Sequence, residues 1–399
     1  MSRTRTAGVA ALVLSSALLT ACSGNDATPS ADGGPAAAAE EQQTPEVPPL
    51  RVSTNVKSAD VPVDQQLEVT ARNGSLTKVV VTSGAGRLEG KLNGAGTAWT
   101  ATGRLEPGQQ YVVRSVGEDA EGGRETSTEK FRTADLTLDE QTYPSVAPLA
   151  GETVGVGMPV IVTFDVPVTD RAEFERHMTV SSTPQQAGTW HWLSDYEARW
   201  RPKTYWKSGT DVSVDVDINS VDAGHGIYGQ ESRKVDFTVG DANIYKVDMD
   251  THQMRVFSNG SLLRTLPITT GEEPTYTTRS GTKVIIEKFA SKRMNSETVG
   301  IDPNSSEGYN IGNVQYAMRV TYSGEFIHAA PWSVASQGSA NVSHGCTGMS
   351  TADAAWLYNM TKRGDVVEYT GTDRGMTLDN GYGDWNEDFA TYSEGSALG

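Results

Sequence analysis

Short stretches in which apolar and polar residues alternate, separated by turns rich in glycine, recur between residues 50 and 240. Residues 67–71 (LEVTA) and 212–216 (VSVDV) are two of them, and Asn-Gly and Pro-Gly pairs mark several turns. A strand that buries one face has this period of two, and many such strands at short intervals are typical of β-sandwiches. The pattern predicts an all-β-dominated chain with two immunoglobulin-like modules, residues 50–135 and 136–240.

The second module contains most of the tryptophans of this region. Trp190, Trp192 and Trp200 lie in two neighbouring runs that we expect to be strands. Large aromatic side chains dominate the burial of small cores, so we expect these residues inside the module. A platform on which sugars stack is the alternative.

Charge and cysteine content limit the partners of the chain. Its 399 residues are enough for two to four domains, and 33 basic against 50 acidic residues give a net charge of −17. An acidic surface repels the phosphates of nucleic acids, so we expect no nucleic-acid partner. The only cysteines, Cys22 and Cys346, are too few for a disulfide framework.

The N-terminus has the pattern of a secretory signal. Two arginines precede an apolar run, residues 7–19, which is too short to span a bilayer as a stable helix. The ending Leu-Thr-Ala-Cys at Cys22 is similar to a bacterial lipoprotein box. We expect residues 1–21 to be removed and Cys22 to be lipidated, which would anchor the protein on the extracytoplasmic face of the cell membrane. Ordinary cleavage that leaves Cys22 as a free thiol is the alternative.

Residues 22–49 are poor in large apolar side chains and rich in Ala, Pro, Gly, Glu and Gln. Such a segment cannot bury enough surface to fold, so we expect a disordered tether. A flexible chain of this length spans about 30 Å on average. The tether would let the folded domains reach from the membrane towards a cell wall.

A third domain is predicted over residues 241–371. It opens with two strands, residues 244–249 and 253–257. Asn259-Gly260, the residue pair that favours a type I′ turn, follows the second strand and leads into residues 262–271. Residues 283–289 are predicted to form one further strand.

The second half of this domain is expected to hold a lid and a helix. Residues 293–308, which include Met294, are long and turn-rich, as expected of a lid over a site. Ser350 can cap a helix that ends before Gly364. Residues 372–399 are predicted to be an extension packed on this domain.

Residues 326–350 contain the groups best suited to chemistry. A free thiol is mostly protonated at neutral pH, so a nucleophilic Cys346 needs a nearby base or positive potential. His344 lies two positions before it, which in an extended segment places the two side chains side by side. His328 lies further upstream, at the end of an apolar run, and can face the thiol from a neighbouring strand.

The pattern His328-x-Ala330-Pro331-Trp332, followed by Ser343-His344-Gly345-Cys346, resembles the active-site signature of the L,D-transpeptidases. These are cysteine enzymes that cross-link peptidoglycan stem peptides. The resemblance implies that Cys346 is the nucleophile and His328 its base. It also implies that the main-chain carbonyl of Ala329 holds the other imidazole nitrogen.

The same resemblance assigns roles to residues around the nucleophile. His344 and Gly345 would shape the turn and offer main-chain N–H groups to an oxyanion, and Tyr309 would lie beside the substrate carbonyl. The substrate-binding residues that it implies are Tyr309, Ala329, Trp332, Ser343 and Met294.

The chain departs from the family at one position, because Gly348 stands where the signature usually has asparagine. If only a substrate contact is lost, restoring the asparagine should raise kcat/KM several-fold. A left-handed backbone at Gly348 is the alternative.

The resemblance implies the reaction. The thiolate attacks the third residue of a tetrapeptide stem, releases D-alanine and holds a thioester, which an amine of a second stem converts into a 3→3 cross-link. Actinobacterial members of the family also carry two immunoglobulin-like modules. We expect no metal or organic cofactor, peptidoglycan stems as partners, and acylation of Cys346 by carbapenems.

Other interpretations remain open at this point. Cys346 and His328 could also serve a carboxypeptidase or endopeptidase that uses water as the acyl acceptor. A non-catalytic lipoprotein that binds the cell wall is a further alternative. A lone cysteine is often only a small buried apolar residue. A zinc site of His328, His344 and Cys346 would lack a fourth ligand at convincing spacing.

Overall fold

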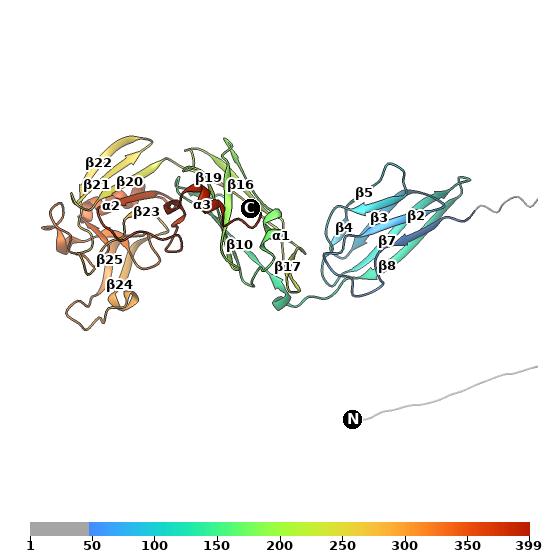
Figure 1. Ribbon diagram of the computed structural model, residues 1–399, viewed down its shortest axis with the longest axis horizontal. Coiled ribbons are helices and arrows are strands. Elements are labelled where there is room, and N and C mark those ends of the chain that lie inside the picture. Colours follow the sequence, from blue (N-terminus) through green and yellow to red (C-terminus); the bar gives the residue numbers. More distant parts are fainter. Residues whose placement is uncertain (1–47) are drawn as a thin grey trace, which may run out of the picture. The chain divides into compact units, whose positions relative to one another are not determined.

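The computed structural model describes residues 48–399, whose strands fall into three groups along the chain (Figure 1). The predicted signal peptide, Cys22 and nearly all of the predicted tether lie outside the described residues. Within residues 48–399, no helix is long and apolar enough to cross a membrane.

The first group of strands forms two four-stranded sheets around a hydrophobic core. Leu67, Val81, Trp99 and Phe131 are buried in this core. One sheet has the order β1 (Arg51–Thr54), β2 (Glu68–Arg72), β6 (Ala98–Ala101), β5 (Gly90–Leu92). The other has the order β4 (Gly86–Leu88), β3 (Gly74–Ser83), β7 (Gln110–Asp119), β8 (Arg124–Arg132).

The second group also forms two four-stranded sheets, with a small third sheet beside them. The first has the order β10 (Pro144–Ala147), β12 (Val160–Phe164), β15 (Glu197–Pro202), β14 (Gly188–Ser194). The second has the order β11 (Thr153–Val154), β19 (Arg233–Val239), β16 (Asp211–Val216), β13 (Met178–Thr183). The third joins β17 (Asp222–Gly224), β18 (Ile227–Gly229) and β9 (Gln141–Thr142).

The tryptophans of the second group lie inside it, as predicted. Trp190, Trp192 and Trp200 are 5%, 5% and 6% exposed and belong to one hydrophobic cluster. Two short helical segments complete the group: η1 (Leu138–Glu140) and α1 (Arg171–Arg176), which is capped by the side chain of Asp170.

The third group contains two sheets and one longer helix. The five-stranded sheet has the order β22 (Ser261–Pro267), β21 (Gln253–Ser258), β20 (Asn243–Asp248), β28 (Val366–Thr370), β23 (Gly281–Val284). The four-stranded sheet has the order β24 (Glu287–Asn295), β25 (Asn310–Arg319), β26 (Phe326–Ala329), β27 (Thr347–Met349). The predicted type I′ turn is confirmed, because Asn259 and Gly260 have φ angles of 48° and 81°.

The single strand predicted over residues 283–289 is wrong. The chain leaves the five-stranded sheet after Val284 and enters the four-stranded sheet at Glu287. Ile285 packs into the core of the third group, whereas the next residue, Ile286, packs into the core of the second. Two adjacent buried residues on opposite sides hold the chain at this crossing, and β24 then leads to the predicted lid, with η2 (Ser296–Val299).

The predicted helix after the cysteine is confirmed as α2 (Thr351–Met360). The hydroxyl oxygen of Ser350 accepts a hydrogen bond from the Asp353 N–H at 3.1 Å and so caps the helix. Ala354 and Leu357 are buried against β25 and β26. Because α2 begins shortly after β27, its packing fixes the strand that follows Cys346.

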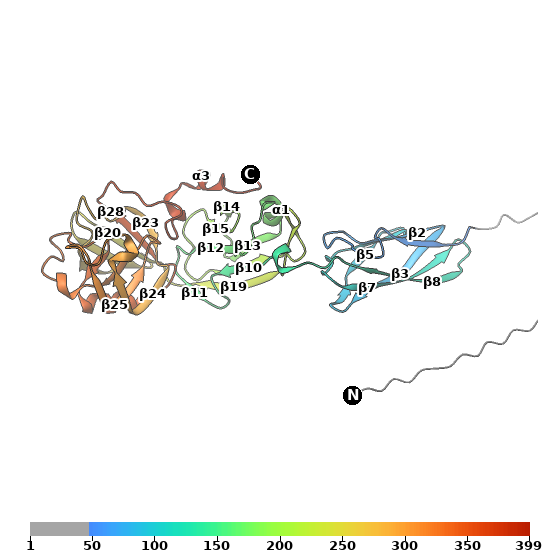
Figure 2. The same ribbon diagram turned by 90° about the horizontal axis from the view of Figure 1, so that it is seen from below.

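The C-terminal segment reaches further than the predicted packing on the third domain. Asn386, in η4 (Asp384–Asn386), bonds both the N–H and the carbonyl of Thr282 at 2.7 Å. Beyond it, α3 (Phe389–Ser393) lies beside β14 of the second group (Figure 2). The chain end therefore binds both groups.

Charged residues of β15 hold this segment. Arg201 is buried, and its guanidinium lies 4.9, 5.4 and 4.3 Å from the ring centroids of Trp385, Phe389 and Tyr392. Arg199 donates to the carboxylate of Asp384 at 3.2 Å, with both side chains buried. A buried charge is stable only when it is paired or enclosed in this way.

Candidate active site

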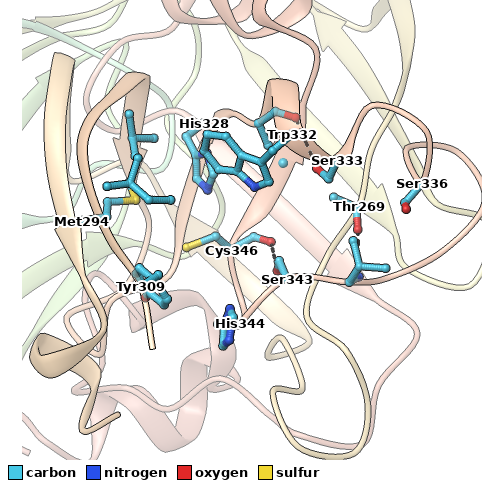
Figure 3. Close-up of a pocket in the computed structure, with 15 residues that line it drawn as sticks. Thr269, Met294, Tyr309, His328, Trp332, Ser333, Ser336, Ser343, His344 and Cys346 are labelled. Atoms are coloured by element: carbon cyan, nitrogen blue, oxygen red, sulfur yellow. Dashed lines mark hydrogen bonds between the residues drawn. The ribbon is translucent and has the colours of Figure 1, made fainter. Parts of the chain in front are cut away.

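The third group of strands contains a pocket of about 420 Å³. β24, β25, β26, β27 and the segment before β23 each contribute lining residues, and the segment that joins β26 to β27 contributes the largest share. Seven of the predicted site residues line it, and all seven are labelled in Figure 3: Met294, Tyr309, His328, Trp332, Ser343, His344 and Cys346. Gly345 and Ala329 do not line the pocket. Both residues are buried.

Strand register brings the thiol and the upstream imidazole to the same end of the sheet. β26 and β27 are parallel, and their register pairs Ile327 with Thr347 and His328 with Gly348. Ile327 turns into the core, so the next side chain, His328, faces the pocket. Cys346 comes just before β27, so it lies at the edge where His328 faces the same cavity.

His328 is held in one protonation state. The residue is 6% exposed, and its Nδ1 lies 2.8 Å from the main-chain oxygen of Ala329. A carbonyl oxygen only accepts hydrogen bonds, so Nδ1 carries the hydrogen and Nε2 keeps its lone pair. Burial lowers the pKa of His328, which keeps the ring neutral at pH 7. This contact is the one implied by the family resemblance.

Cys346 is a protonated thiol in this environment. Part of the residue remains exposed to the pocket, but the atoms packed around its sulfur raise the pKa of the thiol to about 11. The S–H donates to the main-chain oxygen of Gly324 at 3.6 Å. The local charges therefore do not form a thiolate in advance, so a base must remove the proton.

The turn before Cys346 is fixed by Ser343. Its hydroxyl oxygen accepts a hydrogen bond from the Gly345 N–H at 3.1 Å and donates to the Cys346 carbonyl at 2.6 Å. Gly345 has a φ of +115°, which favours glycine. Here the structure differs from the expected oxyanion site, because the Gly345 N–H already has a partner.

His344 is placed by aromatic contacts. Its ring centroid lies 4.4 Å from that of Tyr276 and 5.1 Å from that of Tyr309. Its Nε2 lies 3.7 Å from a carboxylate oxygen of Glu307, beyond hydrogen-bonding distance. Figure 3 shows His344 and His328 on different sides of Cys346, whose sulfur points towards the side where Met294 and Tyr309 lie. This placement fits the predicted role of His344 in shaping the turn before Cys346.

Trp332 lies at the mouth of the pocket. Its side chain is 57% exposed, and its ring centroid lies 5.9 Å from that of His328. It is therefore a wall of the site and not a core residue.

Sequence reasoning missed several residues that line or border the pocket. Thr269 and Ile311 belong to segments that carry no chemical motif, and Glu307 is an ordinary loop carboxylate in sequence. Only the pairing of strands brings them to the site. Among residues 48–399, no group of three or more His, Cys, Asp or Glu residues is arranged to hold a metal ion.

Of the two explanations offered for Gly348, the left-handed backbone is wrong, and the lost substrate contact stays a prediction. Its φ is not positive, so no left-handed backbone demands glycine. A Cβ at this position would lie 2.8 Å from the Cβ of Ala330 and 3.1 Å from the Cγ2 of Thr269. The space that an asparagine would fill is already occupied, so glycine is needed for packing.

We expect Gly348→Asn to lower the free energy of unfolding by about 1–3 kcal/mol, the usual effect of overpacking. Thermal and urea unfolding measure it. Gly312→Asn is the matched control, because a Cβ at Gly312, also in a strand of this sheet, meets no atom within 4 Å. The double variant Gly348→Asn/Ala330→Gly should recover part of the loss. A Gly348→Asn protein as stable as the Gly312→Asn control would contradict the packing explanation.

Comparisons with known proteins agree with this site. Residues 58–222 match the model of a bacterial Ig domain, and residues 242–368 match that of the L,D-transpeptidase catalytic domain. These matches confirm the predicted fold class, immunoglobulin-like modules followed by a β-rich catalytic domain.

Individual relatives extend over most of the chain. L,D-transpeptidase 2 of Mycobacterium tuberculosis is 36% identical over 354 residues, which cover 88% of this chain and 85% of that protein. L,D-transpeptidase 1 of the same species is 40% identical over 57% of this chain and 84% of its own. A solved L,D-transpeptidase in complex with imipenem aligns with a TM-score of 0.50 and 40% identity, covering 57% of this chain and 97% of that one. The chain therefore belongs to the L,D-transpeptidase family.

Proposed function

We propose that this protein forms 3→3 cross-links in peptidoglycan through a thioester on Cys346. The observation that carries the proposal is the state of the two groups in the pocket. His328 is neutral with Nε2 free, and Cys346 is a protonated thiol at the same edge of the sheet. A neutral base beside a protonated nucleophile is the arrangement that acyl transfer requires.

In the first half-reaction, the Cys346 thiol gives its proton to Nε2 of His328 while the sulfur attacks the carbonyl of the third stem residue. The carbon–nitrogen bond to the terminal D-alanine then breaks. The leaving amine takes the proton from Nε2, and the donor stem remains as a thioester. In the second half-reaction, an amine of another stem loses a proton to Nε2 and attacks the thioester, and the released sulfur recovers that proton.

The negative oxygen of each tetrahedral intermediate needs donors. Because the Gly345 N–H is engaged, we assign this role to the Cys346 N–H and the Tyr309 hydroxyl. Burial raises the pKa of Tyr309 to about 12, so the hydroxyl keeps its hydrogen at neutral pH. The proposed steps use no metal or organic cofactor.

Carbapenems fit the same chemistry. A β-lactam carbonyl offers the sulfur an acyl group with a leaving nitrogen, as the stem amide does. A relative has been solved in complex with imipenem, which supports acylation of Cys346 in this chain. Met294, Trp332 and Ser343 would contact the acyl group, because they line the pocket around the sulfur.

The location of the protein is proposed from sequence alone. The apolar run and the lipoprotein-like ending at Cys22 support a lipid anchor on the extracytoplasmic face of the membrane, with residues 22–49 as the tether that reaches the wall.

The reaction is tested by mass spectrometry of the purified protein with a tetrapeptide stem. We expect a thioester adduct on Cys346, release of D-alanine, and a cross-linked dimer. Cys346→Ala should lose all three and keep the wild-type melting temperature, because only one atom at the pocket is changed. Release of D-alanine without dimers would identify a hydrolase, and dimers formed by Cys346→Ala would rule out the thioester.

The two histidines should differ sharply. We expect His328→Ala to lower kcat/KM for D-alanine release by about 10²–10⁴-fold, the usual worth of a general base. His344→Gln should cost far less, because that ring contacts Tyr276 and Tyr309 and not the proton path. Since burial lowers the pKa of His328 below its ordinary 6.5, the wild-type rate should fall only below that pH, as the base becomes protonated. Equal losses in both variants would reverse the assignment.

The anchor is tested by Cys22→Ser. We expect the variant to leave the membrane fraction of detergent-free extracts while its activity on a soluble stem stays unchanged, because the lipid acts only through location. A variant that still sediments with membranes would show that another anchor exists.

A further inference from the structure

Three charged side chains lie together behind the turn that carries Cys346, and the reaction described above uses none of them. Lys283 is fully buried, and its ammonium contacts one carboxylate oxygen of Glu325, which is 6% exposed. The other oxygen accepts from the Arg279 guanidinium at 3.0 Å and from the Arg279 N–H at 3.2 Å. Buried ions destabilise a protein unless they are paired, so the cluster must be well satisfied.

The cluster ties three separate segments to one carboxylate. Lys283 lies in β23, Arg279 ends the loop before β23, and Glu325 begins the approach to β26. The same loop holds the nucleophile turn directly, because the Thr278 hydroxyl donates to the Gly345 carbonyl at 2.9 Å.

Glu325 and the residue before it lie close to the turn that carries Cys346. The carbonyl of Gly324, the residue before Glu325, accepts from the Cys346 thiol. The Cγ of Glu325 lies 3.9 Å from the place where a Cβ of Gly345 would be.

Lys283 is linked to the residue after Cys346 through Tyr369. Its ammonium lies 3.7 Å from the ring centroid of Tyr369, whose hydroxyl shares a 2.8 Å hydrogen bond with that of Thr347, the residue after Cys346.

We propose that Glu325 is a positioning residue for Cys346, and that Lys283 is present to offset its negative charge at the sulfur. The proposal rests on the nucleophilic role given to Cys346 above. Glu325 places the Gly324 carbonyl and the loop behind Gly345. A carboxylate so close to a developing thiolate would oppose its formation, and the ammonium cancels that effect.

The charges around the sulfur give the direction of each effect. Glu325 raises the pKa of the Cys346 thiol, whereas Lys283 and Arg319 lower it. Other titratable or charged groups that face the sulfur or the cluster are His328, Tyr309, Tyr369 and Arg279.

The titration of Lys283 sets an upper pH limit on its help in ionising the Cys346 thiol. Burial lowers its pKa to about 8, against the opposing pull of Glu325. When pH rises through that value, Lys283 loses its charge while Glu325 keeps its own, so the thiol becomes harder to ionise.

The test is the rate of alkylation of Cys346 by iodoacetamide against pH, in a Cys22→Ser background so that one thiol reacts. At pH 7, where Lys283 is still charged, we expect Lys283→Met to slow alkylation about tenfold, one pKa unit, and Glu325→Gln to speed it about threefold. The double variant Lys283→Met/Glu325→Gln should lie within about threefold of the wild type, because both charges are gone while an amide oxygen can still accept from Arg279. Lys246→Met, which removes a half-exposed lysine paired with Glu368, is the matched control and should change nothing.

The direction of the change in alkylation rate distinguishes an electrostatic role of the cluster from a purely structural one. If the cluster only supports the fold, Lys283→Met and Glu325→Gln will change the rate in the same direction, and the proposal falls. If the single variants unfold, Lys283→Arg and the double variant decide. Both must then alkylate near the wild-type rate, and a loss of more than about tenfold in either overturns the proposal. Because iodoacetamide needs no turnover, a failed transpeptidase assay leaves this result unaffected.

Discussion

The site depends on the parallel pairing of β26 with β27. This register places His328 opposite Gly348, so the imidazole faces the cavity at the edge from which Cys346 projects. A slip of one residue would turn His328 into the core and Ile327 towards the sulfur. The buried side chains around the pair prevent that slip: Ile327 and Met349 within the sheet, and Leu357 on the helix that follows. Hydrophobic packing therefore determines how accurately His328 and Cys346 are placed relative to each other.

Because the thiol and the imidazole are both buried, both rest uncharged. Separated charges would be costly in this environment, since neither group keeps enough water to stabilise an ion. The proton moves only when a substrate carbonyl supplies a place for the negative charge. Such a nucleophile is slow towards indiscriminate electrophiles and selective for acyl groups that fit the pocket.

Much of the fold and of the site could be predicted from sequence, because alternation marks half-buried strands and the residues around Cys346 form a recognisable signature. The crossing at Ile285 and Ile286 could not. Two adjacent isoleucines look like one continuous strand, and nothing local says that they enter different cores. Lys283 and Glu325 were missed for a related reason. A charged residue in a strand is expected to face water, and only the tertiary fold shows that these two face each other.

The route of the chain end has a consequence for the order of folding. The buried guanidiniums of Arg199 and Arg201, in the second module, find their carboxylate and aromatic partners among residues 384–392. These partners follow the whole third group of strands along the chain, so they are synthesised after that group. The second module therefore completes the pairing of its buried arginines only when residues 384–392 are present, although Arg199 keeps Glu197 as a partner within the module. A chain without residues 384–392 would keep every residue that lines the pocket but lose the contacts that join the second group of strands to the third, so its stability would suffer before its chemistry.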